Sequence, residues 1–483
     1  MMRWMAAATA AWLAAGLPAV SQDGRDALRE EISRRAAERL ESLRRDVGRL
    51  LERELGGVAG FASVEERVTA DSIQAIVGRL ASDEFEGRGS GYPGNDKATE
   101  FIAGVYKAAG LAPVGDKDEA GTPTYFQHFS NRNNRRTRNT VALLEGSDPS
   151  LKGEIVVIGG HHDHLGKGAQ APFGQALGRT QGGDDIYNGA DDNGSGSSTV
   201  VALAKAFGES GARPKRSLLF MTFSGEEWGL IGSNYYCEHP IFPLTRTVAM
   251  INLDMVGRNP DRPVKLQGFA TDSSGLLEKV ARQAAAGTGL NAEFIASPSV
   301  GGGDSDHTSF RRRGVPVIFF FTGLHPDYHK VSDHVDRLAY DNMRKIGRTA
   351  ARILWELADS SEKPKGQDPG FRFPPETPSG GSSRRLGIIP DQGFRSADMD
   401  ALGLKADEGG VAVSSVSADS AAARAGLKDG DVIVGFGGRA LPRPVGAALD
   451  EIRKGIQAAK AGEEVEVVVL RRGERISLKA QWQ

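Results

Sequence analysis

Short apolar runs alternate with longer amphipathic segments through the middle of this 483-residue chain. Four of the apolar runs are continuous, and they cover residues 154–160, 217–223, 248–253 and 315–321. Continuous runs of this length are typical of strands that are buried on both faces of a sheet. Helices are predicted between or after these strands, at residues 199–207, 273–285 and 341–358. This rhythm predicts an α/β fold with a doubly wound, mostly parallel sheet.

Further helices are predicted ahead of the sheet. Residues 73–80 and 96–109 have helical patterns and are joined by a glycine-rich loop. Before them, apolar residues recur every three or four positions from residue 23 to about residue 54, which predicts one long amphipathic helix within a segment at 22–66. Fewer than four clean heptads are present, so packing against its own domain is favoured over a coiled-coil dimer.

The first residues have the pattern of a targeting signal. Residues 1–21 begin with one positive charge, continue with an apolar run and end in a small-x-small pattern, as a secretory signal peptide does. An uncleaved anchor helix is the alternative, but the run is too short to span a membrane comfortably. We therefore expect a secreted or periplasmic protein that keeps no membrane-spanning segment after cleavage.

The C-terminal part is set apart by composition. A Pro/Gly/Ser-rich stretch at residues 360–384 is typical of a linker. It separates a predicted domain at residues 67–359 from a smaller unit of short strands and helices at 385–483.

Composition excludes some classes of function. Basic and acidic residues number 60 and 62, so there is no general electrostatic case for binding nucleic acid or an anionic membrane. The chain has one cysteine, Cys237, and cannot form an intrachain disulfide even in an oxidising compartment. Stability must therefore come from the core.

Residues that can bind a metal follow each of the four predicted strands. They are His161 and Asp163 after the first, Glu226 and Glu227 after the second, Asp254 after the third, and His325, Asp327 and His329 after the fourth. The turn at residues 187–198 adds the adjacent carboxylates Asp191 and Asp192. Because the carboxyl ends of the strands of an open α/β sheet line one crevice, we expect these side chains to converge.

A crevice lined by these side chains is expected to bind cations. Clustered carboxylates and imidazoles repel and desolvate one another unless a cation neutralises them. Zinc accepts both kinds of ligand, and a catalytic zinc keeps one position for water. Five protein ligands are too many for one open tetrahedral site but suit two ions that share a carboxylate. Glu226 and Glu227 point in different directions, so one can face the metals while the other takes a proton from water.

Five motifs match a known family in order. They are H-x-D at 161–163, G-A-D-D at 189–192, S-G-E-E at 224–227, N-L-D-M at 252–255 and D-Y-H at 327–329. Over about residues 67–358 the chain resembles the M28 zinc exopeptidases, a group of secreted co-catalytic aminopeptidases. S-D-E-F-E-G-R at 82–88 and S-D-H-T-S-F at 305–310 look like flanking signatures of its bacterial members. The resemblance implies the zinc exopeptidase fold and hydrolysis of peptides that have a free N-terminus.

The resemblance also implies two zinc ions with five protein ligands. Asp191 is expected to bridge the two ions, and the peptide bond from Asp191 to Asp192 is expected to be cis. The remaining ligands are expected to be His161 and Asp254 on one ion, and Glu227 and His329 on the other.

Further residues receive roles by the same resemblance. Glu226 is expected to be the general base, and Asp163 is expected to orient His161. Asp306, His307 and Tyr328 are expected near the substrate. Five further histidines of this region are expected to be surface or hydrogen-bonding residues and not ligands, and they are His162, His164, His239, His325 and His334.

The C-terminal unit resembles a PDZ domain of the bacterial protease-associated kind. Residues 421–438 match the central signature of these domains, and residues 445–453 would form the groove helix. The carboxylate-binding loop would consist of Leu386, Gly387, Ile388 and Ile389. Such domains bind a peptide C-terminus beside an edge strand. A packing unit with an unused groove is the alternative.

Other functions fit parts of the pattern. A glutaminyl cyclase shares the fold and much of the motif set but uses one zinc. An M20-type carboxypeptidase or deacylase has similar ligands but inserts a lid domain, for which the span from Asp254 to His329 leaves no room. A protein that only binds peptides is disfavoured because no ligand position is lost.

Overall fold

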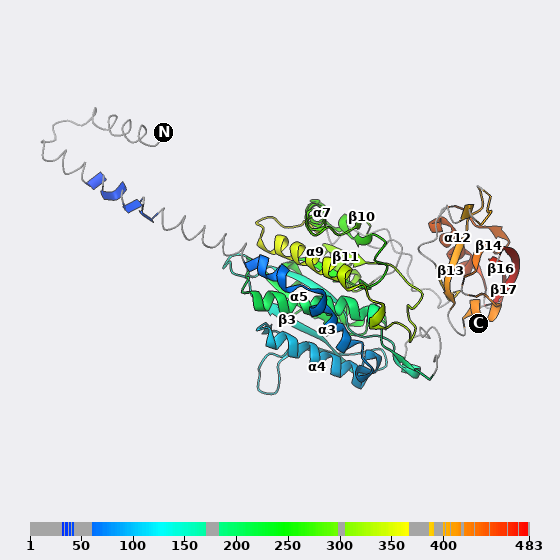
Figure 1. Ribbon diagram of the computed structural model, residues 1–483, viewed down its shortest axis with the longest axis horizontal. Coiled ribbons are helices and arrows are strands. Elements are labelled where there is room, and N and C mark those ends of the chain that lie inside the picture. Colours follow the sequence, from blue (N-terminus) through cyan, green and yellow to red (C-terminus); the bar gives the residue numbers. More distant parts are fainter. Residues whose placement is uncertain are drawn as a thin grey trace, which may run out of the picture. The chain divides into compact units, whose positions relative to one another are not determined.

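The computed structural model in Figure 1 describes most of the chain. The described residues are 31–42 except 33, 37 and 40, then 60–170, 183–297, 305–366 and 386–390, and finally 399–481 apart from 401, 406, 417–419, 429, 444, 461 and 472. The predicted signal peptide and most of the predicted linker lie outside them. Described positions within 31–42 are helical. Backbone contacts divide the chain into residues 1–59 and 60–483.

A nine-stranded mixed sheet forms the centre of the larger unit. In chain order its strands are β1 (Ala112–Pro113), β2 (Phe126–Ser130), β3 (Arg136–Leu144), β4 (Ile155–His161), β7 (Ser217–Phe223), β8 (Thr247–Leu253), β9 (Val264–Gln267), β10 (Ala292–Ile295) and β11 (Val317–Phe321). The spatial order is β1-β3-β7-β4-β8-β11-β9-β10, with β2 also paired to β3. The four central strands β7, β4, β8 and β11 are parallel, and β3 and β9 flank them in antiparallel pairing.

Helices cover both faces of this sheet. In chain order they are α3 (Ala70–Leu80), η1 (Asp83–Arg88), α4 (Pro93–Ala108), α5 (Gly196–Ser210), α6 (Ile231–Glu238), α7 (Leu276–Thr288), α8 (His307–Arg311) and α9 (Tyr340–Asp359). Figure 1 shows α9, α5 and α4 lying side by side, and α5 and α9 both contact the central strands. Side chains of β4 alternate between two cores: Val156 packs in the core under α5 and α9, and Val157 packs with Tyr236 of α6 and Phe310 of α8. The doubly wound, mostly parallel sheet is therefore confirmed.

The four central strands have nearly the bounds that the apolar runs predict, and β7 has the same bounds. The flanking strands were not predicted. In β3 the first residues, from Arg136 to Thr140, are polar, and β9, β10 and β1 have four residues or fewer, so none of them gives a continuous apolar run. Among the described residues, no helix is both long and apolar enough to cross a membrane.

The C-terminal part of the chain folds around a sheet of its own. Its strands are β12 (Ile388–Pro390), β13 (Val411–Val416), β14 (Val432–Phe436), β15 (Arg439–Ala440), β16 (Glu464–Arg471) and β17 (Glu474–Gln481). The order is β12-β13-β14-β16-β17, all neighbours are antiparallel, and β15 pairs with β14. Helices α11 (Ala421–Ala425) and α12 (Val445–Ala458) contribute side chains to the same apolar core.

Candidate metal centre

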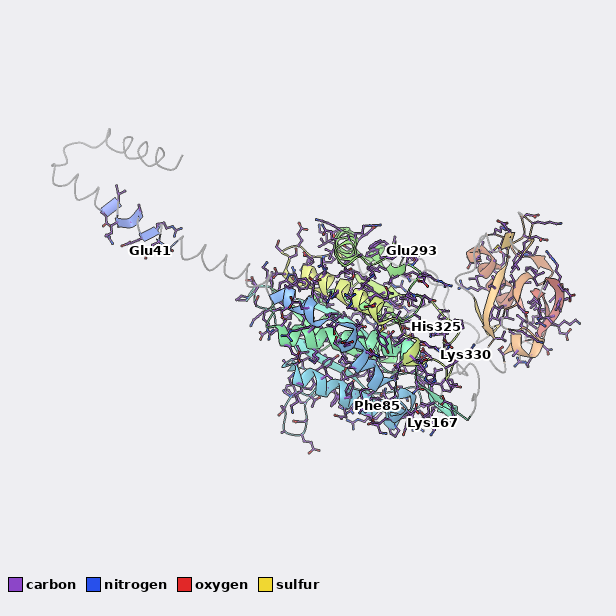
Figure 2. The ribbon with its side chains drawn as sticks, viewed as in Figure 1. Glu41, Phe85, Lys167, Glu293, His325 and Lys330 are labelled. Atoms are coloured by element: carbon purple, nitrogen blue, oxygen red, sulfur yellow. The ribbon has the colours of Figure 1, made fainter. Side chains whose placement is uncertain are left out.

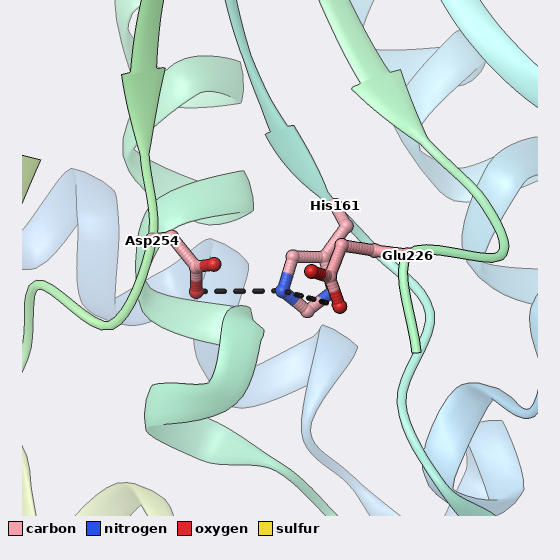
Figure 3. A group of neighbouring side chains, drawn as sticks. All are labelled: His161, Glu226 and Asp254. Atoms are coloured by element: carbon pink, nitrogen blue, oxygen red, sulfur yellow. Dashed lines mark ion pairs between the residues drawn. The ribbon is translucent and has the colours of Figure 1, made fainter. Parts of the chain in front are cut away.

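The last residue of β4, His161, is the centre of one group of ligating atoms. Its Nδ1 lies 3.1 Å from the backbone oxygen of Asp163. A carbonyl oxygen only accepts, so Nδ1 carries the hydrogen and Nε2 is free to bind a cation. That Nε2 faces Asp254 Oδ1 at 3.3 Å and Glu226 Oε2 at 3.9 Å. Figure 3 shows both contacts, made from the ends of β4, β8 and β7.

A second group lies around His329 and Glu227. Nε2 of His329 lies 3.3 Å from Glu227 Oε2. Nδ1 of His164 lies 2.8 Å from the other oxygen of the same carboxylate. All three side chains are almost completely buried. The backbone of His329 has a φ of 57°, a left-handed conformation that is uncommon for a residue other than glycine and that concentrates at functional sites.

The carboxylate of Asp192 joins the two groups. Its Oδ1 lies 3.4 Å from His161 Nε2, and its Oδ2 lies 3.1 Å from His329 Nε2. Each oxygen therefore faces a different imidazole. A carboxylate in this position could be shared by two cations.

The carboxylate that lies between the two groups is therefore that of Asp192. The resemblance had implied Asp191 as the bridging ligand. Asp191 turns away from both groups: its Oδ1 accepts a hydrogen bond from the backbone nitrogen of Gly257 at 2.6 Å, and its Oδ2 lies 3.2 Å from Nε2 of His325. The cis peptide bond is likewise one residue further along, between Asp192 and Asn193. The prediction was wrong by one position because both aspartates are equally good turn residues, and only these tertiary contacts distinguish them.

Asp163 acts differently from the prediction. Its backbone oxygen, and not its carboxylate, binds the His161 ring, since the carboxylate is 3.8 Å from Nδ1. The carboxylate instead accepts a hydrogen bond from the backbone nitrogen of Glu226 at 3.2 Å. Burial raises the pKa of Asp163 to about 7. Asp163 therefore links the β4 end to the loop that carries the two glutamates.

The two adjacent glutamates have opposite electrostatic environments. Burial raises the pKa of Glu226 well above its ordinary value, and the nearby carboxylates of Glu227 and Asp254 raise it further, although His161 opposes this. Burial also opposes ionisation of Glu227, but His329 and His164 lower its pKa well below the ordinary value. Glu226 also has the most exposed side chain of the cluster, at 15%. It is therefore placed to exchange a proton with a molecule that enters the site.

Arg88 supports the site in a way that was not predicted, although it ends the S-D-E-F-E-G-R motif at 82–88. Its guanidinium is fully buried and donates hydrogen bonds to four backbone oxygens, from Leu80, His162, Asn188 and Gly189. Burial lowers the pKa of Arg88 to about 10, so the group stays charged at neutral pH. Of its acceptors, His162 directly follows His161, and Asn188 and Gly189 belong to the turn that carries Asp192. Arg88 therefore fixes two loops of the site and adds a positive charge beneath them.

The donor set of the cluster suits divalent cations. Nε2 of His329 and Oδ1 of Asp254 are buried, and neither has a hydrogen-bond partner among the described residues. Burial by itself would lower the pKa of His329, but the carboxylates of Glu227 and Asp192 raise it to about 10. The cluster thus has more imidazole nitrogens and carboxylate oxygens than hydrogens to bond them. Zn²⁺ or a similar ion binds both kinds of atom and would satisfy them. The residues present therefore fit two cations that share Asp192.

Comparison with protein families agrees with this fold and site. Residues 139–354 match the sequence model of peptidase family M28, and residues 391–481 match that of the PDZ domain. Residues 139–354 thus form an M28 peptidase domain. The match contains the strands β4, β7, β8 and β11 and every member of the two groups of ligating atoms. The predicted resemblance to both families is confirmed.

Curated relatives match parts of this chain. Leupeptin-inactivating enzyme 1 of Streptomyces exfoliatus is 29% identical over 286 residues, which is 54% of this chain and 58% of the relative. Aminopeptidase YwaD of Bacillus subtilis (strain 168) is 28% identical over 185 residues, which is 37% of this chain and 39% of that protein. The chain thus spans about half the length of these relatives. Among solved structures, an aminopeptidase from Aneurinibacillus sp. strain AM-1 is 16% identical, with a TM-score of 0.48 over 62% of this chain and 97% of its own.

The residues expected near the substrate lie around the M28 site. Asp306 and His307 are buried at the start of α8, and burial raises the pKa of Asp306 to about 7. The ring of Tyr328 stacks on His329 with centroids 3.8 Å apart. Asp327 is not part of the cluster, because Arg258 and Arg337 bind its carboxylate at 2.9 and 2.8 Å.

The other histidines divide into two kinds. His162 is buried and pairs with the Thr222 hydroxyl at 2.8 Å, and His325, labelled in Figure 2, lies against Asp191. The side chain of His334 is partly exposed, at 42%, and the His239 ring stacks on Tyr235. These four are hydrogen-bonding or surface residues, as expected. His164 is a hydrogen-bonding residue as well, with Nδ1 2.8 Å from Oε1 of Glu227, but this contact places it inside the cluster.

The predicted carboxylate-binding loop of the PDZ domain precedes and enters β12. The backbone oxygen of Leu386 accepts a hydrogen bond from Ala422 of α11 at 2.7 Å. Gly387 has a φ of 81°, and a Cβ at this position would overlap the side chain of Ser420. Glycine is therefore required at the second position of this loop.

Proposed function

We propose that the chain is an exported metallo-aminopeptidase with two zinc ions that removes N-terminal residues from peptides. The observation that carries this proposal is the position of Asp192 between two imidazoles, with one oxygen 3.4 Å from His161 and the other 3.1 Å from His329. Asp254 completes the first group of ligands and Glu227 the second. The names of two relatives, an aminopeptidase and a leupeptin-inactivating enzyme, agree with action on peptides.

The residues divide the chemistry among themselves. When bound, two zinc ions would polarise the scissile carbonyl and lower the pKa of a water molecule. Glu226 then accepts the proton of this water and passes it to the leaving amine, a role that its raised pKa and partial exposure suit. Asp163 holds Glu226 in place through the backbone nitrogen. Asp306, His307 and Tyr328 are the side chains we assign to the substrate side.

The number of ions separates this proposal from the main alternative. A glutaminyl cyclase would use one zinc. His161 with Asp254, and His329 with Glu227, form two donor groups that each need a cation, and this favours two ions. Zinc content by elemental analysis of the purified protein tests this directly: about two ions per chain are expected, and one ion would favour the cyclase.

Substrate assays test whether hydrolysis starts at the N-terminus of a peptide and needs a free amine there. A panel of aminoacyl amides and peptides, free or blocked at the N-terminus, is assayed with and without a chelator. We expect cleavage only where the amine is free, and loss of activity with the chelator that zinc restores. Equal cleavage of N-blocked peptides would refute exopeptidase action, and ring closure of an N-terminal Gln peptide without hydrolysis would indicate the cyclase.

We further propose that the PDZ domain binds a peptide C-terminus or a protein partner beside β12. Its loop presents backbone groups around Gly387, where no side chain fits. Titration of the protein with a peptide library that differs only at the C-terminal carboxylate, free or amidated, tests this. Binding that survives amidation would contradict capture of the carboxylate.

A further inference from the structure

His164 has no role in the proposed chemistry, although it lies inside the ligand cluster. Its side chain is fully buried. Nδ1 lies 2.8 Å from Oε1 of Glu227 and 3.9 Å from Oδ2 of Asp192. The ring meets His329 edge to face, with centroids 5.7 Å apart. It is therefore part of the same packed group as two of the proposed ligands.

The position of the ring is tightly fixed. The backbone nitrogen of His164 donates to the Arg88 oxygen at 3.3 Å. The ring covers Gly189, where an added Cβ would overlap His164 Cγ and Cδ2. The first residue of the G-A-D-D motif is thus a glycine partly because an imidazole lies against it. The ring is thus packed against the backbone of the turn that carries Asp192.

The contact with Glu227 is a hydrogen bond and not shared coordination. A carboxylate offers only acceptors, so Nδ1 must carry the hydrogen at this distance. A protonated Nδ1 cannot also bind a metal. The Glu227 carboxylate consequently has its two oxygens in different environments, with Oε1 on His164 and Oε2 facing His329 at 3.3 Å.

We propose that His164 is a positioning residue that occupies Oε1 of Glu227 and so restricts this ligand to one coordinating oxygen, Oε2. This rests on the proposed function, because it takes Glu227 to be a metal ligand. A one-oxygen ligand would leave a coordination position free at a cation bound beside His329, where a substrate group could bind. Partners of this kind also fix the orientation of a ligand, and their loss typically costs about 10–100-fold in metal affinity.

The test compares His164→Ala with His164→Asn in the full-length protein loaded with Co²⁺. The amide NH₂ of asparagine lies close to the place of Nδ1 and can still donate to Oε1. In His164→Ala the freed oxygen can join the coordination, so we expect a higher coordination number. It should appear as weaker visible absorption of the bound Co²⁺ and as roughly 10–100-fold weaker Zn²⁺ binding in chelator competition. His164→Asn should restore both properties towards wild type.

His162→Ala is the matched control. It also removes a buried imidazole of the same loop, but its partner is Thr222 and not a ligand. We expect a lower melting temperature and an unchanged Co²⁺ spectrum. A wild-type spectrum and Zn²⁺ affinity in His164→Ala would overturn the proposal, as would a His164→Asn variant as impaired as His164→Ala. If the wild-type protein itself binds neither Zn²⁺ nor Co²⁺, the metal centre is wrong, and this outcome differs from a failure of the His164 role alone.

Discussion

The carboxylate of Asp333 accepts a hydrogen bond from the backbone nitrogen of Asp192 at 3.1 Å. The same oxygen accepts from the nitrogen of Asp191 at 2.9 Å. Asp333 is fully buried, so both amides have an acceptor that water does not compete for. With the backbone held in this way, the two consecutive carboxylates point in different directions. Asp192 faces His161 and His329, and Asp191 faces His325.

This divergence predicts different effects for the two aspartates. Asp192→Ala removes the carboxylate shared by both groups, so we expect nearly complete loss of bound zinc. Asp191→Ala should retain much of the zinc but cost about 1–3 kcal/mol of unfolding free energy, because the buried Gly257 nitrogen loses its acceptor. Elemental analysis and urea denaturation of both variants separate these effects. Full zinc in Asp192→Ala together with none in Asp191→Ala would restore the original assignment of the bridge.

The general base is tested by Glu226→Gln, which preserves the size of the side chain but cannot accept the proton. We expect both ions to remain bound and turnover to fall about 10²–10⁴-fold. Glu227→Gln is the matched comparison on the adjacent residue, and it should lose metal because its carboxylate lies within the second donor group. Near-normal turnover in Glu226→Gln would remove Glu226 from this role.

Sequence reasoning could locate the site because the central strands are continuously apolar and end in charged residues. His161, Glu226, Glu227 and Asp254 come together for that reason: each follows a parallel strand at the same edge. The motif order supplied the family. Neither argument requires knowledge of the tertiary contacts that fix the conformation of a particular turn.

The parts that could not be predicted depend on contacts between distant segments. The distinction between Asp191 and Asp192 depends on tertiary contacts, since Gly257 and His325 bind the Asp191 carboxylate and are 66 and 134 positions away in the sequence. His164 has the same residue type as His162 two positions earlier, yet one ring faces Glu227 and the other Thr222. The only available signal was the alternation of side chains along an extended segment, which places residues 162 and 164 on one face and so could not separate them.

The metal-free protein should lose stability as the pH rises. The folded-state pKa of His329 is raised to about 10, so its stabilising contribution is complete below its unfolded value of about 6.5 and disappears as the pH approaches 10. Burial raises the pKa of Asp163 and of Asp333 to about 7, so their ionisation penalises the folded state increasingly from about pH 4 to pH 7. Both effects lower the free energy of unfolding as the pH rises.

Zinc should reverse this trend, because its ligands must lose their protons and its affinity therefore rises with pH. We expect the melting temperature in excess chelator to be lower at pH 8 than at pH 6, and the increase caused by zinc to be larger at pH 8. Scanning calorimetry in both conditions measures this. A chelated protein that is more stable at pH 8 would contradict the electrostatic account of the cluster.

Arg88 supplies the last prediction, on how the site is held together. Arg88→Met fills the same space but leaves the oxygens of Leu80, His162 and Asn188 without this donor in a buried environment. We expect a loss of at least about 3 kcal/mol of unfolding free energy and weaker zinc binding, since two of these loops carry ligands. Arg79→Met is the control: Arg79 is about half exposed and pairs with Glu84 at the surface, so the change should stay within about 0.5 kcal/mol. If both variants unfold at the same urea concentration as wild type, the buried guanidinium does not support the two loops as argued.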